Sequence, residues 1–397
     1  MAAEADGHRD RCAIAGIGAT DFSRRSGRSD LTLALQASMA ALDDAGLTPA
    51  DVDGIVRCDH DLVRHNDLAE GLGVRNLTFW GEVGPGGVAP CAMIGQAVGA
   101  IVSGQATTVL AYRSLNGRSG VRYGMAPLGT DHQLVGGAMS YDELFMPYGL
   151  LTAGQMFAFM AQRHMVEYGT TSEQLGHIAI TCRARANANP SAQMHDRALS
   201  LDDYLAARMI SSPLRLFDFC LETDGACAVV VTSTERALDG PKPPAVIRAV
   251  AQASGPNVQP GLMFPVLTRP SITEQPSALV APLLYERAGL GPDEIDVAQL
   301  YDCFTITVLM QLEDYGFCKR GEGGPFAADG ELDLGGSLPI NTGGGHLSEG
   351  YIHGMNHVVE GVRQIRGEST SQVPGAETCL VTSAPPPGTS AMILRAA

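Results

Sequence analysis

The segment Asn341–His357 (NTGGGHLSEGYIHGMNH) concentrates groups that can do chemistry. It holds three histidines, one tyrosine and five glycines within seventeen residues. Histidine and tyrosine can take up and release protons, and glycine lets a ligand approach the backbone closely. The following residues, Met355–Ile365, have a helical pattern, so the start of that helix could face an anion. A glycine-rich loop alone is weak evidence, and an ordinary structural loop is the alternative.

Two further stretches place polar groups at the ends of predicted elements. Tyr301-Asp302-Cys303-Phe304-Thr305 directly follows a predicted strand, and ligands of open α/β sheets bind beyond the carboxyl ends of strands. The alternative is a core tyrosine with a satisfied hydroxyl. Gly84–Cys91 opens a predicted helix that runs to Ser103, and its free N–H groups could stabilise an oxyanion. A plain loop and helix start is the alternative there.

Metal and Schiff-base chemistry are weaker hypotheses. His353 and His357 are spaced i, i+4 with His346 nearby, a pattern that can hold zinc. No carboxylate at ligand spacing other than Glu349 completes the set, and CoA binding explains the glycine-rich loop more simply. We therefore expect no metal. The chain has two lysines, Lys242 in a proline-rich stretch and Lys319, and a Schiff-base mechanism would rest on Lys319 alone.

An internal repeat indicates the elements that position these residues. Ala45–Asp53 (AGLTPADVD) returns as Ala288–Asp296 (AGLGPDEID), and each copy joins a helical pattern to a short apolar run. The pattern predicts a helix, a glycine cap, a proline-started turn and a strand, twice. Ala97–Arg113 and Val358–Thr382 each indicate a helix leading into a strand. Two halves of parallel βαβ construction are therefore expected.

The boundary between the halves is predicted at Gly240–Pro244 (GPKPP), which gives units 1–239 and 245–397. Residues 117–215 are expected to form an insertion with helical patterns at Gln155–Tyr168 and Leu201–Met209. It is either a loop domain that covers the substrate or helical padding. The segment Glu222–Val231 then predicts a turn into a buried strand.

Composition excludes several classes. With 397 residues, 45% hydrophobic and 18% charged, the chain is an ordinary globular protein. No apolar run is long enough for a membrane helix and the N-terminus is too polar for a signal peptide, so we expect a cytoplasmic protein without membrane contact. A net charge of −16 disfavours nucleic acid. Nine cysteines without a CxxC pair are expected to be mostly buried thiols.

Together the motifs resemble the thiolase superfamily, in particular its sterol-carrier and lipid-transfer branch. The similarity runs from Cys12–Gly18 (CAIAGIG) through Thr223–Val231 (TDGACAVVV), YDCFT and the glycine-rich loop to the last strand. It implies an α/β thiolase fold: two duplicated βαβ-rich halves, layered α-β-α-β-α, with an inserted helical loop domain.

The departures from that family are informative. The position of the thiolase nucleophilic cysteine matches Gly87, and Cys91 lies about one turn inside the helix. The catalytic histidine matches Tyr351, the histidine of the lipid-transfer branch matches Tyr301, and the second cysteine meets Ser383–Pro387. Without a thiolate, the covalent acyl step is lost. The pattern with two tyrosines resembles the thiolase-like aldolases of steroid side-chain degradation.

This resemblance implies an acyl-CoA retro-aldolase, a carbon–carbon lyase that releases a ketone and a shorter acyl-CoA from a β-hydroxyacyl-CoA. The expected acyl group is a steroid side chain. Tyr351 and Tyr301 would exchange protons with the substrate, and the nearby His346 or His353 would supply part of the environment that lowers a tyrosine pKa. The expected backbone contacts with CoA are at four glycines: Gly343, Gly344, Gly345 and Gly87.

No cofactor is expected beyond the CoA moiety of the substrate. The implied partners are a second copy of the chain, in a homodimer, and a small OB-fold and zinc-ribbon protein, giving a heterotetramer. Two alternatives stay open. One is a condensing or thiolytic acyltransferase that uses Cys303 or Cys91, and the other is a non-catalytic acyl-CoA or lipid carrier.

Overall fold

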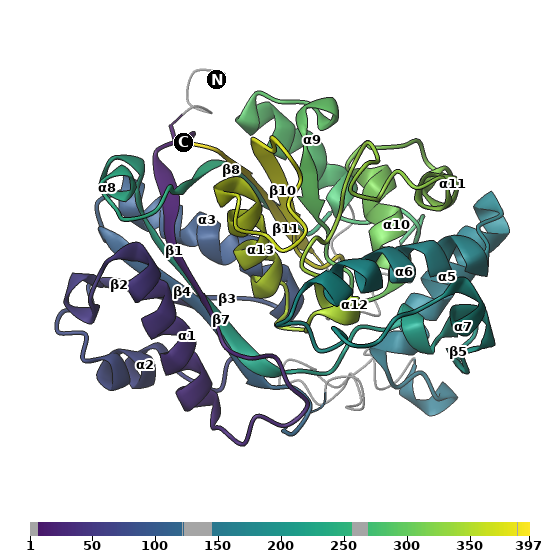
Figure 1. Cartoon of the computed structure of the whole chain (residues 1–397), viewed down its shortest axis with the longest axis horizontal. Coiled ribbons are helices and arrows are strands. Elements are labelled where there is room, and N and C mark those ends of the chain that lie inside the picture. Colours follow the sequence, from purple (N-terminus) through teal and green to yellow (C-terminus); the bar gives the residue numbers. More distant parts are fainter. Residues whose placement is uncertain (1–6, 121, 123–144, 256–268, 387) are drawn as a thin grey trace.

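The repeated segment folds in the same way twice. The computed structural model describes residues 7–120, 122, 145–255, 269–386 and 388–397 (Figure 1). Helix α1 (Asp30–Ala45) ends at Gly46 (φ 67°), and helix α9 (Ser277–Ala288) ends at Gly289 (φ 66°). Both glycines adopt the left-handed conformation that a glycine cap needs. A proline-started 3-10 turn and a strand follow in each copy, which confirms the predicted repeat.

An aspartate closes the repeated unit in both halves. Asp53 accepts hydrogen bonds from the backbone N–H groups of Thr107 and Thr108, at 2.9 and 2.8 Å, where strand β4 begins. Asp296 accepts the corresponding bonds where strand β10 begins, from Glu377 and Thr378 at 2.9 and 2.8 Å. The repeated sequence therefore fixes a tertiary contact as well as a turn.

The strands form one large mixed sheet with the order β3-β2-β4-β7-β1-β8-β11-β10-β9. The run β2-β4-β7-β1 and the run β9-β10-β11-β8 have the same sequence of parallel, antiparallel and antiparallel pairings. The two runs meet where β1 pairs with β8. The strands are β1 (Cys12–Ala19), β2 (Gly54–Cys58), β3 (Phe79–Val83), β4 (Thr108–Asn116), β7 (Asp224–Ser233), β8 (Ala245–Ala253), β9 (Val297–Gln299), β10 (Thr378–Thr382) and β11 (Thr389–Arg395).

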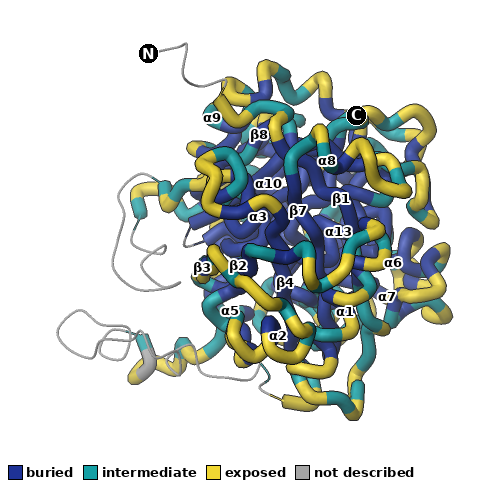
Figure 2. The backbone as a smooth tube through the Cα atoms, turned by 90° about the vertical axis from the view of Figure 1, so that its left-hand side faces the viewer, coloured by how far each residue is buried: buried dark blue, intermediate teal, exposed yellow. Residues whose placement is uncertain are grey.

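Two helices, α3 (Ala89–Val102) and α13 (Met355–Arg366), lie between the halves and contact strands of both (Figure 1). Their apolar side chains share one core with inward-facing residues of both runs of strands. Helix α1 covers the outer face of the first half, and α9 covers that of the second. This is the predicted α-β-α-β-α layering. Figure 2 shows β4 and β7 as buried and much of α2 (His65–Leu72) as exposed.

The predicted insertion is mainly helical in its described part. It contains α5 (Ala153–Tyr168), α6 (Ser172–Ala188), which was not predicted, and α7 (Leu201–Ala206). Helix α7 stops short of the predicted Met209 because Met209–Ser211 forms strand β5 of a small hairpin with β6 (Leu214–Arg215). Residues 121 and 123–144 of the insertion, and Pro387, lie outside the described residues. The boundary at 240–244 and the covering role of the insertion stay predictions.

The remaining helices are α8 (Thr234–Leu238), α10 (Thr305–Asp314), α11 (Gly323–Ala328) and α12 (Gly345–Ser348). Among the described residues, no helix combines the length and apolar character needed to cross a bilayer. All nine cysteines are free thiols and seven of them are buried, as expected from their spacing.

Candidate active site

Two tyrosines that are fifty positions apart in the sequence meet at their hydroxyl groups. Tyr301 follows β9, and Tyr351 lies between α12 and α13. Their Oη atoms are 2.9 Å apart, within hydrogen-bonding distance. Tyr301 is 1% exposed, and Tyr351 is half-buried. The structure thus brings together both predicted proton-exchanging residues, and Tyr351 lies on the more accessible side.

The backbone of each tyrosine is fixed by other elements. The N–H of Tyr301 donates to Thr382 Oγ1 at the end of β10 (2.9 Å), and its carbonyl accepts from Gln311 of α10 (2.8 Å). The N–H of Tyr351 donates to Thr223 Oγ1, just before β7, at 2.8 Å. Because both halves of the fold contribute, the 2.9 Å contact depends on how the two halves pack against each other.

The predicted glycines lie in this region, and each makes room for protein atoms. A Cβ on Gly87 would stand 2.2 Å from Tyr301 Oη. On Gly345 it would stand 2.2 Å from the Asp302 carboxylate, and on Gly344 2.7 Å from Ala186. Gly343 packs beside Glu349, where a Cβ would be 3.1 Å from the carboxylate. Their close approaches are therefore to the protein itself, and direct contact with CoA stays a prediction.

His346 packs against both tyrosines. Its ring makes edge contacts with Tyr301 and Tyr351, with centroids 4.5 and 4.8 Å apart. Its Nε2 atom lies 3.1 Å from Asn356 Oδ1. Burial, reinforced by His357, lowers the pKa of His346 to about 3. The imidazole is consequently neutral at physiological pH.

His353 reaches the pair from the other side, with its ring 4.9 Å from that of Tyr351. Its Nδ1 atom lies 2.8 and 3.1 Å from the guanidinium nitrogens of Arg113, and Arg113 also pairs with Asp61 at 2.5 Å. A guanidinium can only donate, so Nδ1 accepts and His353 is the neutral Nε2–H tautomer. Burial and the Arg113 charge lower the pKa of His353 well below its usual value.

This corrects the expected role of the histidines. Neither His346 nor His353 carries the positive charge that would lower a tyrosine pKa, because both imidazoles are buried and neutral. Burial instead raises the pKa of Tyr301 and of Tyr351 well above 10, although Arg113 partly opposes the effect at Tyr351. The pair is therefore protonated on both oxygens at neutral pH.

Several polar residues around the pair were missed. Asp302 accepts from His357 Nε2 at 2.9 Å and from the N–H groups of His346 and Leu347 at 2.8 and 3.2 Å. The other missed residues are Arg113, Asp61 and Asn356. Arg113 ended a predicted strand and Asp61 lies three residues after β2, so charged residues near strand ends were the available signal.

The start of α3 lies beside the pair through Gly87, but part of its amide set is occupied. The N–H groups of Cys91 and Ala92 donate to the hydroxyls of Ser383 and Ser390, at 3.1 and 3.0 Å. These two groups are therefore not open to an oxyanion, contrary to the expectation from sequence. The positive end of the α3 dipole still points toward this region.

The cysteines required by the acyltransferase alternative are protonated. Cys91 is fully buried, and burial raises the pKa of its thiol to about 12. Burial also raises the pKa of Cys303 far above its usual range. A nucleophilic thiolate is therefore disfavoured at both positions.

The residues of the metal alternative are each engaged in separate contacts. His353 faces the Arg113 cation, which disfavours a metal ion at its Nδ1. His357 is bonded to Asp302, and Glu349 to Asn356. The predicted set of three histidines and Glu349 therefore does not converge on a common point. Two of its histidines do converge with another residue: ligand atoms of His346, His357 and Asp302 lie within 4.8 Å of one another, close enough to hold a metal ion.

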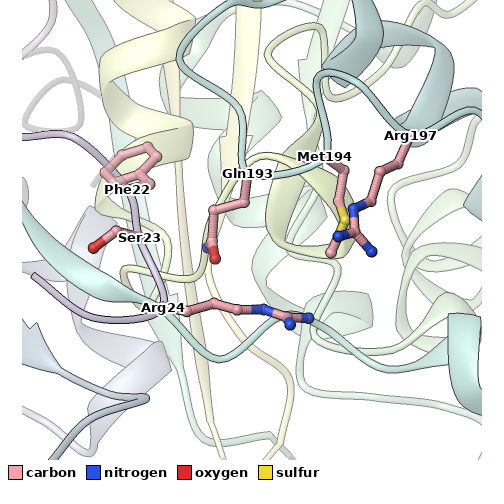
Figure 3. Close-up of a pocket in the computed structure, with 6 residues that line it drawn as sticks. All are labelled: Phe22, Ser23, Arg24, Gln193, Met194 and Arg197. Atoms are coloured by element: carbon pink, nitrogen blue, oxygen red, sulfur yellow. The ribbon is translucent and has the colours of Figure 1, made fainter.

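A surface pocket lies between the segment 22–24 and the segment that joins α6 to α7 (Figure 3). Gln193 in its wall donates to Thr223 Oγ1 (2.5 Å), the same hydroxyl that accepts from Tyr351 N–H. None of the predicted site residues lines this pocket. Its lining consists of Phe22, Ser23, Arg24, Gln193, Met194 and Arg197.

Comparison with known proteins supports the resemblance to thiolases and thiolase-like aldolases. Residues 265–394 match the family described as thiolase C-terminal domain-like. A steroid side-chain-cleaving aldolase from Thermomonospora curvata is 46% identical over 385 residues, 97% of each chain. A 17-hydroxy-3-oxo-4-pregnene-20-carboxyl-CoA lyase from Mycobacterium tuberculosis is 43% identical, covering 97% of this chain and 99% of the relative.

A solved structure agrees over the same length. The Ltp2-ChsH2(DUF35) aldolase superposes with a TM-score of 0.91 at 46% identity, and covers 98% of both chains. Since these two relatives, at 43–46% identity, and this solved structure are aldolases or lyases, the resemblance extends beyond the common thiolase fold. The chain belongs to the thiolase superfamily, in the group that includes the steroid side-chain-cleaving aldolases.

Proposed function

We propose that this protein is an acyl-CoA retro-aldolase, a carbon–carbon lyase of thiolase fold. Its substrate is a β-hydroxyacyl-CoA, and the lyase relatives favour a steroid side-chain thioester with a tertiary hydroxyl on the ring. The products are a steroid ketone and a shorter acyl-CoA. The observation that carries the proposal is the 2.9 Å contact between Tyr301 and Tyr351 in a site without a reactive thiolate.

The tyrosine pair suits a reaction that moves one proton from oxygen to carbon. Cleavage of the Cα–Cβ bond leaves its electrons in a thioester enolate while the β-hydroxyl becomes a ketone. One tyrosine accepts the hydroxyl proton as it passes its own proton to the other, which protonates the enolate carbon. Both phenols are restored, and neither free CoA nor an oxidant is consumed.

The raised pKa values agree with such a relay. A separate phenolate would be unstable in this buried site, since burial raises the pKa of both tyrosines. A relay between two hydrogen-bonded phenols avoids a long-lived phenolate, because proton gain and loss occur together. The Arg113 cation and the α3 dipole favour negative charge as it develops.

The test is product analysis with a β-hydroxy, β-branched acyl-CoA, with no free CoA added. Wild type should release ketone and shorter acyl-CoA, measured by mass spectrometry. Tyr301→Phe and Tyr351→Phe should each lose about 10²- to 10⁴-fold in rate. Tyr285→Phe is the matched control, because Tyr285 bonds a carbonyl outside the site at 2.9 Å. Tight acyl-CoA binding without turnover would support the carrier alternative instead.

We also propose that the chain works as a homodimer together with a small OB-fold and zinc-ribbon partner. Strand β3 is at one end of the described sheet, and its Trp80 is 57% exposed. Such an edge can pair with a second copy. The solved relative is an Ltp2-ChsH2(DUF35) aldolase, so the assay should be run with and without a DUF35 protein. The CoA moiety is the one cofactor-like group proposed, and a cytoplasmic location stays a prediction.

A further inference from the structure

A chain of buried polar side chains leads away from the tyrosine pair. His346 Nε2 lies 3.1 Å from one end of the Asn356 amide, and the other end of that amide lies 3.1 Å from Glu349 Oε2. On its far side, His346 Nδ1 lies 3.3 Å from Asp302 Oδ1. Glu349 is 2% exposed, and Asp302, His346 and Asn356 are between 0 and 1% exposed. The four residues therefore exchange hydrogen bonds among themselves, away from bulk water.

The proton positions on this chain are constrained by one unsatisfied atom. If Asn356 donates to an ionised Glu349, its Oδ1 must accept from His346 Nε2–H. A neutral His346 then presents a lone pair at Nδ1, and that atom has no hydrogen-bond partner among the described residues. The lone pair faces the carboxylate of Asp302 at 3.3 Å, which is repulsive. A buried acceptor facing another acceptor is costly.

The charges around Glu349 also disfavour its ionised form. Glu349 and Glu360 share one cation, Arg363, whose Nη1 is 3.9 and 3.5 Å from their carboxylate oxygens. Glu360 also accepts from the hydroxyls of Thr342 and Ser369, at 2.7 and 2.5 Å. Asn189 donates to Glu349 at 3.3 Å. The other titratable groups that face Glu349 are Asp302, His346 and Cys227, none of which is cationic.

One rearrangement makes the contact between His346 Nδ1 and Asp302 attractive and removes one buried negative charge. The oxygen and nitrogen of an amide are nearly the same size, so a half-turn of the Asn356 side chain keeps both 3.1 Å contacts. We propose that Glu349 is held as a neutral carboxylic acid that donates to Asn356, which donates to His346 Nε2, so that His346 carries its proton on Nδ1 toward Asp302. Burial and the neighbouring Glu360 raise the pKa of Glu349 to about 8, in agreement.

This assignment makes Glu349 a positioning residue for the proposed aldolase, and it rests on that function for its catalytic consequence. It fixes one tautomer of the neutral imidazole that touches both tyrosines. Loss of the Glu349 proton turns the Asn356 amide back and reverses the His346 tautomer. The wild-type rate is therefore expected to fall as pH rises past about 8.

A competing arrangement satisfies the same atoms. An imidazolium at His346 could donate from both nitrogens, with Glu349 ionised and Asn356 not turned. That arrangement adds two buried charges, and burial opposes both the charged His346 and the charged Glu349. The two arrangements predict opposite effects for Glu349→Gln, because glutamine imitates a neutral acid and removes a counter-charge.

The first test does not need substrate. The infrared spectrum of the purified protein at neutral pH should contain the C=O stretch of a protonated, buried carboxylic acid. The Glu349 component of that band should be lost in Glu349→Gln and kept in Glu222→Gln, a control carboxylate in a separate ion pair with Arg122. A wild-type spectrum without the band, or a band of unchanged intensity in Glu349→Gln, overturns the assignment. A stoichiometric metal ion bound by Asp302 and His346 in purified protein would also overturn it.

The second test is the pH profile of turnover. Glu349→Gln should change the rate at pH 7 by less than about threefold and lose the alkaline fall near pH 8. A loss above about tenfold in a folded Glu349→Gln protein would favour the imidazolium and refute the proposal. If the infrared band is present but wild type cleaves no acyl-CoA, the proposed function fails while the assignment of Glu349 stands.

Discussion

Gly87 lies directly against the hydroxyl of Tyr301. A Cβ at position 87 would be 2.2 Å from Tyr301 Oη and 3.0 Å from the Cβ of Ala384. The thiolase resemblance places the nucleophilic cysteine of that family at this position, and here the space that a cysteine side chain would need is filled by a phenol. A cysteine at position 87 and a tyrosine at position 301 would therefore compete for the same space.

Gly87→Ala is expected to separate the tyrosines. The added methyl group must push the Tyr301 hydroxyl away from Tyr351, so turnover should fall roughly a hundredfold, the usual effect of a shift of about 1 Å at a reacting group. The free energy of unfolding should fall by about 1–3 kcal/mol through overpacking. Product formation and chemical denaturation measure the two effects.

The control is Gly99→Ala in α3, the helix that follows Gly87. Residue 99 is exposed, and a Cβ there would meet nothing within 4 Å. Alanine in the interior of α3 should raise the free energy of unfolding by about 0.5–1 kcal/mol and leave turnover unchanged. Equal rates for Gly87→Ala and wild type would show that the 2.9 Å contact is not needed.

The buried Glu349 predicts an unusual pH dependence of stability. Its folded pKa of about 8 lies above the reference value of 4.5, so the unfolded chain loses this proton first as pH rises. The stabilising contribution is complete below pH 4.5 and is lost as pH rises toward 8. The free energy of unfolding of Glu349→Gln relative to wild type, measured by chemical denaturation, should therefore rise by about 1.4 kcal/mol per pH unit between pH 5 and 8. A difference that is constant over this range would mean that Glu349 is ionised in the folded protein.

Features that depend on local interactions could be predicted from the sequence, and features that depend on contacts between distant residues could not. Gly46 and Gly289 cap helices through local backbone geometry, so the repeat and the order of elements could be predicted from short segments. Tyr301 and Tyr351 could be predicted because each occupies a recognisable position in a motif. His353 and Arg113 are 240 positions apart, and nothing in either local sequence indicates that they meet.

The protonation states of buried side chains could not be predicted either, because burial also depends on contacts between distant residues. A histidine beside a tyrosine suggests a cation when burial is unknown. His346 is 0% exposed, so the cost of removing its charge from water decides the outcome. The same unknown concealed Glu349, which was considered only as a metal ligand.

The thiols provide a separate prediction. Cys91→Ala and Cys303→Ala should each keep turnover within about threefold of wild type, because neither sulfur is a thiolate or bonds to the tyrosines. Iodoacetamide should label Cys91 in denatured protein and leave it unlabelled in native protein, as peptide mass spectrometry would show. Inactivation by either substitution, with the fold intact, would restore the acyltransferase alternative.

Asp61 and Arg113 form a buried ion pair that holds His353 beside Tyr351. The two side chains are 0 and 1% exposed, and Asp61 also accepts from the backbone N–H of Ser114 at 2.8 Å. Asp61→Asn leaves a buried guanidinium without this counter-charge, so the free energy of unfolding should fall by about 3–5 kcal/mol. Glu167→Gln, which breaks the exposed Arg163 pair, should lower the free energy of unfolding far less, because solvent screens that pair. Chemical denaturation of both variants compares the pairs directly, and similar losses would mean that the Asp61 pair contributes no more than a surface contact.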